Sequence, residues 1–133
     1  MEDSLSLRIN SKPDEINRVE ELIETLKEKF SLSEDVYGNM MICITEAVNN
    51  AIKHGNENDP NKNVTLNVKK QENKITVQVS DEGDGFDTSE LPDPLATENI
   101  LKNSGRGVFI MKQMADEINY LNNGSTVVLT FQL

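Results

Sequence analysis

The stretch Glu46–Gly55, which reads EAVNNAIKHG, constrains the fold of this chain more than any other part of its sequence. At about 100° per residue, the apolar residues in and just before it fall on one side of a helix, and that side is expected to be buried. They are Ile44, Ala47, Val48, Ala51 and Ile52. Glu46, Asn50 and Lys53 project from the other side, with Asn49 beside them. Asn is a poor helix former, so two of them in mid-helix indicate a site. A solvated polar face that happens to carry Asn is the alternative.

The formal net charge of −10 restricts the partners of this chain. Such a charge repels nucleic-acid phosphates and anionic lipids, so neither nucleic acid nor a membrane surface is an expected partner. Its 133 residues suit one compact domain, residues 1–133, with its own core. Cys43 is the only cysteine and is expected in that core. There is no apolar signal segment and no long apolar run, so a soluble, cytoplasmic protein is expected.

The periodicity of the apolar residues predicts the element order βααββ, loop, αββ. Ser11 and Ser33 are the expected N-caps of the first two helices, and Gly55 is expected to stop the second. The expected strands are Ser4–Asn10, Val64–Lys69, Ile75–Ser80, Glu117–Leu121 and Ser125–Leu133. The first expected helix opens after Ser11, has Glu15 in its first turn and reaches about Phe30; the other two run from Glu34 to His54 and from Val108 to Ala115. The predicted fold class is α+β: a two-layer sandwich in which helices cover one face of a mixed sheet.

The segment that follows the third expected strand reads DEGDGFD, residues 81–87. Gly83 and Gly85 allow the backbone to approach a ligand closely or to adopt positive φ. Asp81, at the end of the strand, could accept a hydrogen bond from an amino group such as the exocyclic amine of adenine. An acidic turn that binds Ca²⁺ is the alternative, although Phe86 and the lack of flanking helices do not fit an EF-hand.

Gly105-Arg106-Gly107 precedes the third expected helix. Amide groups at a helix N-terminus attract phosphate, and glycines let it approach. Arg106 adds a positive charge, whereas a flexible helix start capped by Ser104 is the alternative interpretation. The polar stretch Thr88–Ser104 has no periodicity, and loops of this length are usually lids, binding loops or disordered segments.

Other signatures of nucleotide binding and catalysis are absent from the sequence. It has no P-loop pattern, no dinucleotide fingerprint and no H-R-D catalytic loop. His54 is the only histidine, so no His/Cys metal cluster can form. We interpret His54 as a last-turn residue favoured by the helix dipole, or as a neighbour of the site.

Three motifs in this order resemble the GHKL ATPase superfamily, which has the Bergerat ATP-binding fold. EAVNNAIKH is similar to its N box, DEGDGFD to the box that follows, and SGRGVFIMKQMAD to the glycine box after the lid. Within the superfamily the chain most resembles the bacterial anti-sigma-factor serine kinases, which are short and have the form EA-x-x-NA-x-x-H. One departure is SGRG where many of these kinases have GGLG, so the lid and phosphate contacts are expected to differ.

The resemblance implies that the protein binds ATP and Mg²⁺. It implies that Asn50 holds the metal, that Glu46 is the general base for an attacking hydroxyl, and that Asp81 accepts from the adenine amine. It implies a lid at Thr88–Ser104. The other implied nucleotide contacts are Asn49, Lys53, Gly83, Gly85, Gly105, Arg106 and Gly107.

The resemblance also implies an activity: a Mg-ATP-dependent serine/threonine kinase that acts as an anti-sigma factor. Its partners would be a sigma factor and a STAS-type antagonist protein, which it phosphorylates, and it could act as a homodimer. A regulatory module that binds ATP without transferring phosphate is the alternative; the presence of Glu46 favours the kinase. The catalytic half of a histidine kinase is disfavoured, because it needs a dimerising helix with a phosphorylatable histidine.

Overall fold

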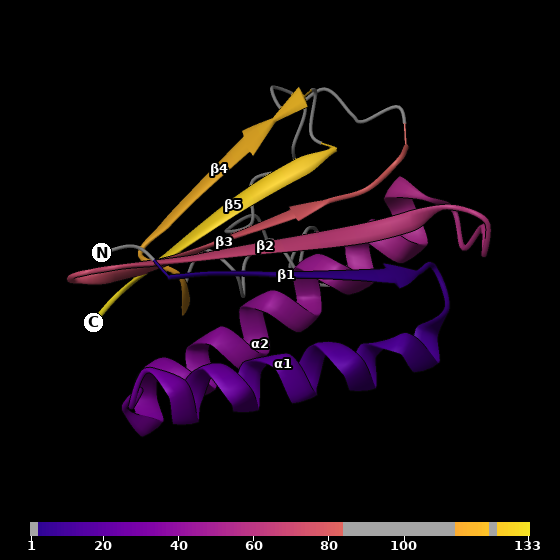
Figure 1. The fold of residues 1–133 in the computed structure, drawn as a ribbon. Coiled ribbons are helices and arrows are strands. Elements are labelled where there is room, and N and C mark those ends of the chain that lie inside the picture. The colour runs from indigo at the N-terminus through magenta and orange to yellow at the C-terminus, as the bar shows by residue number, and fades with distance from the viewer. Residues whose placement is uncertain (1–2, 84–113, 123–124) are drawn as a thin grey trace, which may run out of the picture.

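The computed structural model describes residues 3–83, 114–122 and 125–133, in which two helices pack under one face of a five-stranded sheet (Figure 1). The strands are β1 (Asp3–Asn10), β2 (Asn63–Gln71), β3 (Lys74–Ser80), β4 (Glu117–Leu121) and β5 (Thr126–Gln132). The helices are α1 (Ile16–Lys29) and α2 (Glu34–Asn50), with a 3₁₀ turn η1 (Pro13–Glu15) before α1 and a π-helical turn η2 (Ala51–Gly55) after α2. The predicted α+β class with two layers is confirmed.

The strand order is β1-β2-β3-β5-β4, and every neighbouring pair among the described strands is antiparallel. The prediction of a mixed sheet is therefore wrong for this part of the chain. The chain reverses direction three times between β1 and β2, because two antiparallel helices connect them (Figure 1). It must then return beside β1 in the opposite sense. β2 and β3 form an antiparallel hairpin in which Gln71 pairs with Lys74, so its turn consists only of Glu72 and Asn73.

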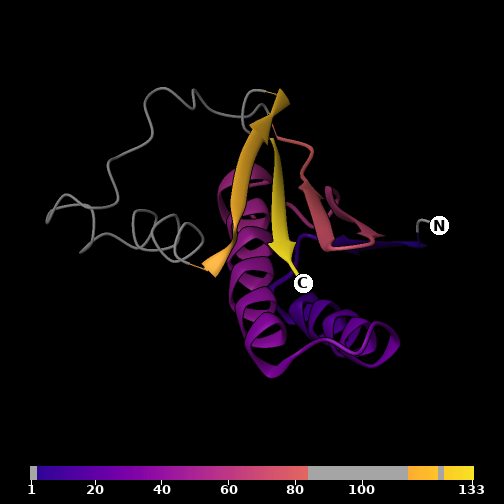
Figure 2. The ribbon, with the colours of Figure 1, turned by 90° about the vertical axis from the view of Figure 1, so that its left-hand side faces the viewer.

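Alternation along the strands places one row of apolar side chains against the helices. Leu66 of β2 pairs with Val79 of β3, which pairs with Val127 of β5, and all three are buried. The predicted apolar stripe of α2 is buried beneath this face: Ile44, Ala47, Val48, Ala51 and Ile52 are at most 6% exposed. α2 packs against β3 and β5, and Figure 2 shows α1 lying to one side of it. Burial of the stripe fixes how α2 is rotated about its axis.

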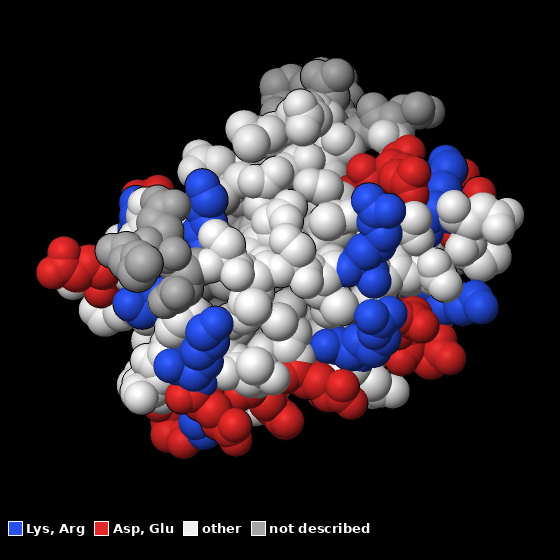
Figure 3. All heavy atoms as spheres, viewed as in Figure 1, with Lys and Arg blue, Asp and Glu red and all other residues white. Residues whose placement is uncertain are grey.

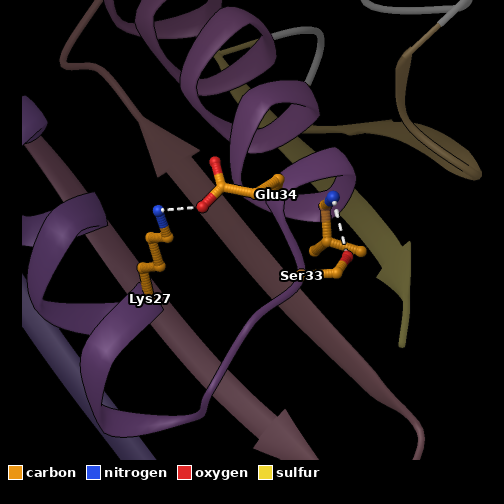
Figure 4. Close-up of polar contacts among 4 residues, drawn as sticks. Lys27, Ser33 and Glu34 are labelled. Atoms are coloured by element: carbon orange, nitrogen blue, oxygen red, sulfur yellow. Dashed lines mark hydrogen bonds and ion pairs between the residues drawn. The ribbon is translucent and has the colours of Figure 1, made fainter.

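The start of α2 is fixed by a side-chain cap, as predicted. Ser33 Oγ accepts a hydrogen bond from the backbone N–H of Val36 at 3.2 Å (Figure 4). Lys27 Nζ lies 2.7 Å from Glu34 Oε1 and 4.4 Å from the centre of the Tyr37 ring. These contacts join the last turn of α1 to the first turn of α2 and set the angle at which the second helix leaves the turn.

Ser11, in contrast, is not a helix cap. η1 and α1 begin at Pro13 and Ile16 without a side-chain cap, and Ser11 is 1% exposed. Its N–H and its Oγ–H both donate to the carbonyl oxygen of Lys62, at 3.1 and 2.7 Å. Pairing between the segments that continue β1 and precede β2 therefore outcompetes capping, and it draws the hydroxyl into the interior.

The exposed face of α1 is rich in acidic side chains. Acidic side chains gather along the edge of the molecule where α1 lies (Figure 3). The exposed acids of that helix include Glu20, Glu21, Glu24 and Glu28. Cys43 is fully buried as predicted, and burial raises the pKa of its thiol to about 12. Within residues 3–83, 114–122 and 125–133, no helix is long and apolar enough to cross a membrane.

Gly38 offers a direct test of how α2 is held. A Cβ built on Gly38 meets nothing within 4 Å beyond the local helix, so alanine fits without displacement. We expect Gly38→Ala to raise the free energy of unfolding by roughly 0.5–1 kcal/mol, because alanine loses less backbone entropy in a helix. Urea denaturation measures this change, and Ser33→Ala, which removes the cap, should lower stability by about 1 kcal/mol. A destabilised Gly38→Ala variant would contradict this account of α2.

Candidate functional site

The polar side of α2 borders solvent along its C-terminal half. Glu46, Asn49 and Asn50 are half-buried, whereas Lys53 and His54 are exposed. Glu46 and Asn50 are one helical turn apart, where side chains are neighbours with roughly 5–6 Å between Cβ atoms. The structure thus brings a carboxylate and a carboxamide together at the margin between core and solvent.

The helix changes geometry immediately after Asn50. The N–H of Asn56 donates to the carbonyl of Ala51 at 2.8 Å, five residues earlier, which is π-helical pairing. The prediction that Gly55 stops an α-helix at His54 is therefore wrong. Gly55 is the last residue of the π turn η2. Single π turns are rare and are often found at functional sites. This one forms the last turn before the chain leaves the helix.

Gly55 lies directly against Asp81 at the end of β3. A Cβ on Gly55 would overlap the Asp81 carboxylate, and a Cβ on Gly83 would overlap the Gly55 carbonyl oxygen. A Cβ at residue 83 would meet backbone and has no room, whereas a Cβ at residue 55 would have to displace the Asp81 carboxylate. Glycine was predicted at residue 83 for close backbone approach, and the backbone that approaches it here is that of Gly55. The contact places the C-terminal end of α2 next to the carboxylate.

Asp81 is held on several sides. Its N–H donates to the carbonyl of Ser125 at 2.9 Å, and its Oδ1 accepts from the N–H of Gly83 at 2.8 Å. Burial raises the pKa of this carboxyl, while the Gly83 N–H and the charge of Lys62 partly oppose the rise. Oδ2 lies beside Gly55, which cannot hydrogen-bond it through a side chain. A half-buried carboxylate of this kind can accept a hydrogen bond from a ligand amine.

A buried polar cluster behind Asp81 was not predicted from the sequence. Asn56 is 0% exposed, and its side-chain oxygen accepts from the N–H of Glu82 at 2.8 Å. Its amide nitrogen donates to Ser11 Oγ at 2.7 Å and to the Asn63 carbonyl at 3.0 Å. The sequence NENDPNK around it is typical of a surface turn, so no local signal distinguishes Asn56 from its exposed neighbours.

Several predicted site residues lie outside the described part of the chain. They are Gly85, Gly105, Arg106 and Gly107, together with the expected lid at Thr88–Ser104 and the helix that starts at Val108. Among residues 3–83, 114–122 and 125–133, no group of three or more His, Cys, Asp and Glu could hold a metal ion. A single amide oxygen, that of Asn50, fits a cation that keeps most of its coordination sites for water and phosphate, as Mg²⁺ does.

Comparison with known proteins decides the family. The family model for the histidine kinase-like ATPase domain matches residues 9–131, which is the chain from the end of β1 to the end of β5. The chain belongs to this family. The match extends over both layers of the fold and includes all the predicted site residues, so the resemblance to ATP-binding GHKL proteins is confirmed.

Three individual relatives show which proteins this chain is similar to. The chain is 25% identical to the serine-protein kinase RsbW of Bacillus subtilis (strain 168) over 135 residues, covering 96% of this chain and 84% of the relative. It is 36% identical to an anti-sigma F factor of Lysinibacillus sphaericus over 101 residues, covering 72% and 69%. It is 41% identical to an anti-sigma F factor of Geobacillus stearothermophilus over 91 residues, covering 65% and 62%. The protein is thus a member of the histidine kinase-like ATPase family that is similar to a serine-protein kinase and to anti-sigma F factors.

The raised pKa of Asp81 predicts how stability depends on pH. In the folded state this carboxyl binds its proton more readily than in the unfolded chain. Stability is therefore lost as pH rises from the ordinary carboxyl range, about 4, through the folded-state pKa. Asp81→Asn removes this charge and keeps an oxygen for the Gly83 N–H, so we expect the variant to be more stable than the parent at pH 7.

Denaturant titrations over a pH series measure this difference, which should shrink as pH falls below about 4. The exposed Glu20→Gln on α1 is the matched control, and it should leave the pH dependence as it is in the parent. An Asp81→Asn variant that is less stable at pH 7 would show that the carboxylate is on balance favourable in the fold.

Proposed function

We propose that this protein is a Mg-ATP-dependent serine/threonine protein kinase that acts on another protein. One observation carries the proposal: Glu46 and Asn50 lie one turn apart on the solvent-bordering side of α2, and the same helix ends against Asp81. A carboxylate and an amide thus share one helix, and the end of that helix contacts the carboxylate of Asp81, which could accept a hydrogen bond from a purine amine. Membership of the ATPase family supports the nucleotide, and a relative named a serine-protein kinase supports the reaction.

In the proposed complex Asp81 accepts a hydrogen bond from the adenine amine and so selects the base. Gly83 and Gly85 pass close to the nucleotide, Gly105 and Gly107 line its phosphates, and the lid closes to exclude water. Arg106, Asn49 and Lys53 contribute polar or positive contacts. The exposed position of Lys53 leaves its ammonium able to reach a phosphate.

Glu46 is proposed as the general base. As the acceptor hydroxyl oxygen bonds to the γ-phosphorus, the bond from that phosphorus to the bridging oxygen breaks, ADP leaves, and the Glu46 carboxylate takes the hydroxyl proton. Asn50 directs its carbonyl oxygen to the metal position, one helical turn further along. When bound there, Mg²⁺ neutralises charge on the phosphates, which is the chief requirement of phosphoryl transfer.

The proposed acceptor is a serine or threonine of a STAS-type antagonist protein, and the proposed second partner is a sigma factor. The two relatives named anti-sigma F factor support the sigma factor, whereas the STAS-type acceptor follows from the resemblance of the three motifs. The net charge of −10 also favours proteins over nucleic acid as direct partners, because a phosphate backbone would be repelled. The resemblance to the anti-sigma-factor serine kinases also leads us to propose a homodimer that binds one partner across both subunits.

Replacing the proposed base gives the sharpest test of catalysis. Glu46→Gln keeps the size of the side chain but removes its ability to take a proton, so phosphate transfer should fall by about 100-fold or more. ATP affinity should stay that of the parent. Transfer of labelled phosphate to a candidate antagonist and calorimetric ATP binding measure the two quantities.

Glu24→Gln, an exposed change on α1, is the control for loss of a carboxylate. Transfer by Glu46→Gln at the parental rate would remove Glu46 from the mechanism. A parent chain that binds ATP but transfers no phosphate to any antagonist would favour the regulatory module instead.

Metal dependence tests Asn50 separately. Asn50→Ala removes an oxygen that would contact a cation, and contacts to charged groups are worth about 1.5–3 kcal/mol, or roughly tenfold to a hundredfold in affinity. We expect that loss for ATP with Mg²⁺ and little loss for ATP in the presence of a chelator. Asn17→Ala, exposed on α1, should change neither affinity. Equal Mg-ATP affinity for the parent and Asn50→Ala would contradict the assignment.

A further inference from the structure

Asn56 is the most completely enclosed amide among the described residues. It has no exposed surface, and its side chain makes three hydrogen bonds, to Ser11, Asn63 and Glu82. Its backbone is also engaged, with the N–H donating to Ala51 and the carbonyl accepting from the N–H of Asp59 at 2.9 Å. Burying an amide is costly unless its groups are paired, so this side chain acts as a connector between segments rather than as packing alone.

The connector joins the two segments that meet at Asp81. Asn56 follows Gly55 in the chain, and Glu82 follows Asp81. Gly55 and Asp81 are in contact, and the hydrogen bond from the Glu82 N–H to Asn56 Oδ1 closes the same junction one residue further on. The junction therefore has two adjacent ties: a steric contact that excludes side chains and a directional bond that fixes the loop.

Further bonds make the junction rigid from behind. The carboxylate of Glu82 accepts from the N–H of Asn63, at the start of β2. Ser11 accepts from Asn56 and donates to the carbonyl of Lys62, so the end of β1 is attached to the same cluster. Lys62 is also the residue whose charge acts on Asp81. No buried side-chain nitrogen or oxygen in the described ranges lacks a hydrogen-bond partner, so the cluster is complete as it stands.

We propose that Asn56 is a positioning residue for recognition of the purine base: through Glu82 it holds the Asp81 carboxylate at a fixed place relative to α2. This inference rests on the proposed function, in which Asp81 accepts from the adenine amine. Because Glu46 and Asn50 are on the same helix, the bond also fixes the separation between the base-binding end of the site and the phosphate-transfer end. Small displacements of such groups weaken recognition strongly.

The test compares ATP with inosine triphosphate, which has a carbonyl oxygen in place of the adenine amine and therefore offers Asp81 no donor at that position of the base. Dissociation constants are measured for the parent, Asn56→Ala, Asp81→Asn and the double variant. We expect Asn56→Ala to weaken ATP by roughly tenfold, a coupling usual for residues in one network, and to leave inosine triphosphate nearly unchanged. In the Asp81→Asn background, Asn56→Ala should have little further effect on ATP.

A purely structural role predicts a different result. It would weaken both nucleotides equally, and its effect would add to that of Asp81→Asn; either outcome overturns the proposal, as does parental ATP affinity in Asn56→Ala. Asn61→Ala, an exposed Asn in the same loop, is the matched control and should change nothing. A parent chain that binds no adenine nucleotide overturns the proposed function and this inference together, which distinguishes it from failure at Asn56 alone.

A second variant and a ligand-free measurement cover the case in which Asn56→Ala fails to fold. Ser11→Ala removes one of the three partners of Asn56 and should reduce the preference for ATP over inosine triphosphate by a smaller factor. Hydrogen exchange of the Glu82 amide should be slow in the parent and faster in Ser11→Ala. An unchanged preference together with an equally slow Glu82 amide would overturn the inference.

Discussion

Burial of one side of α2 is the interaction on which the rest of the structure depends. Five apolar residues between Ile44 and Ile52 pack against the sheet, so the helix can neither rotate nor slide without exposing them. Its rotation keeps Glu46, Asn49 and Asn50 at the boundary of the core, half-exposed to whatever approaches. Its axial position brings Gly55 against Asp81, at the end of a central strand. The candidate site is therefore a by-product of core packing at one end of one helix.

Several residues at the C-terminal end of this helix adopt conformations or environments that they usually disfavour. Two Asn occupy helical positions that they disfavour, the last turn is π-helical, and a carboxyl is buried far enough to raise its pKa. Glu57 and Asn58 follow with positive φ, at 52° and 59°, although neither is glycine. Each feature is unfavourable on its own. Most of them fall in the segment from Asn49 to Asn58, whose Gly55 contacts Asp81, and this separates the region from the opposite end of α2, where Ser33, Lys27 and Glu34 form ordinary stabilising contacts.

Periodicity was sufficient to predict the elements that make the core. The alternation in Val64–Val68 and Ile75–Val79, and the stripe on α2, follow from backbone geometry alone, so they could be derived without knowing any tertiary neighbour. Ser11 and Asn56 could not be placed in this way. Their bond joins residues 45 apart, and locally both look like turn or cap residues, since a Ser two residues before Pro-Asp-Glu is typical of an N-cap. The prediction of a mixed sheet was wrong for a related reason. The direction of a strand depends on how many times the chain reverses before it.

The register of β1 has a consequence for how the chain is made. Asp3 pairs with Lys70 and Asn10 with Asn63, so β1 is an edge strand whose partner, β2, is synthesised only after both helices. Closing so long a connection is slow, and an unpaired strand is open to wrong pairings while it waits. α1 and α2 can form an antiparallel pair during this interval and cover the apolar residues that β1 will later share. β1 can pair only once β2 has emerged, so the link from Ser11 to Asn56 and Lys62 can form only after both helices have been synthesised.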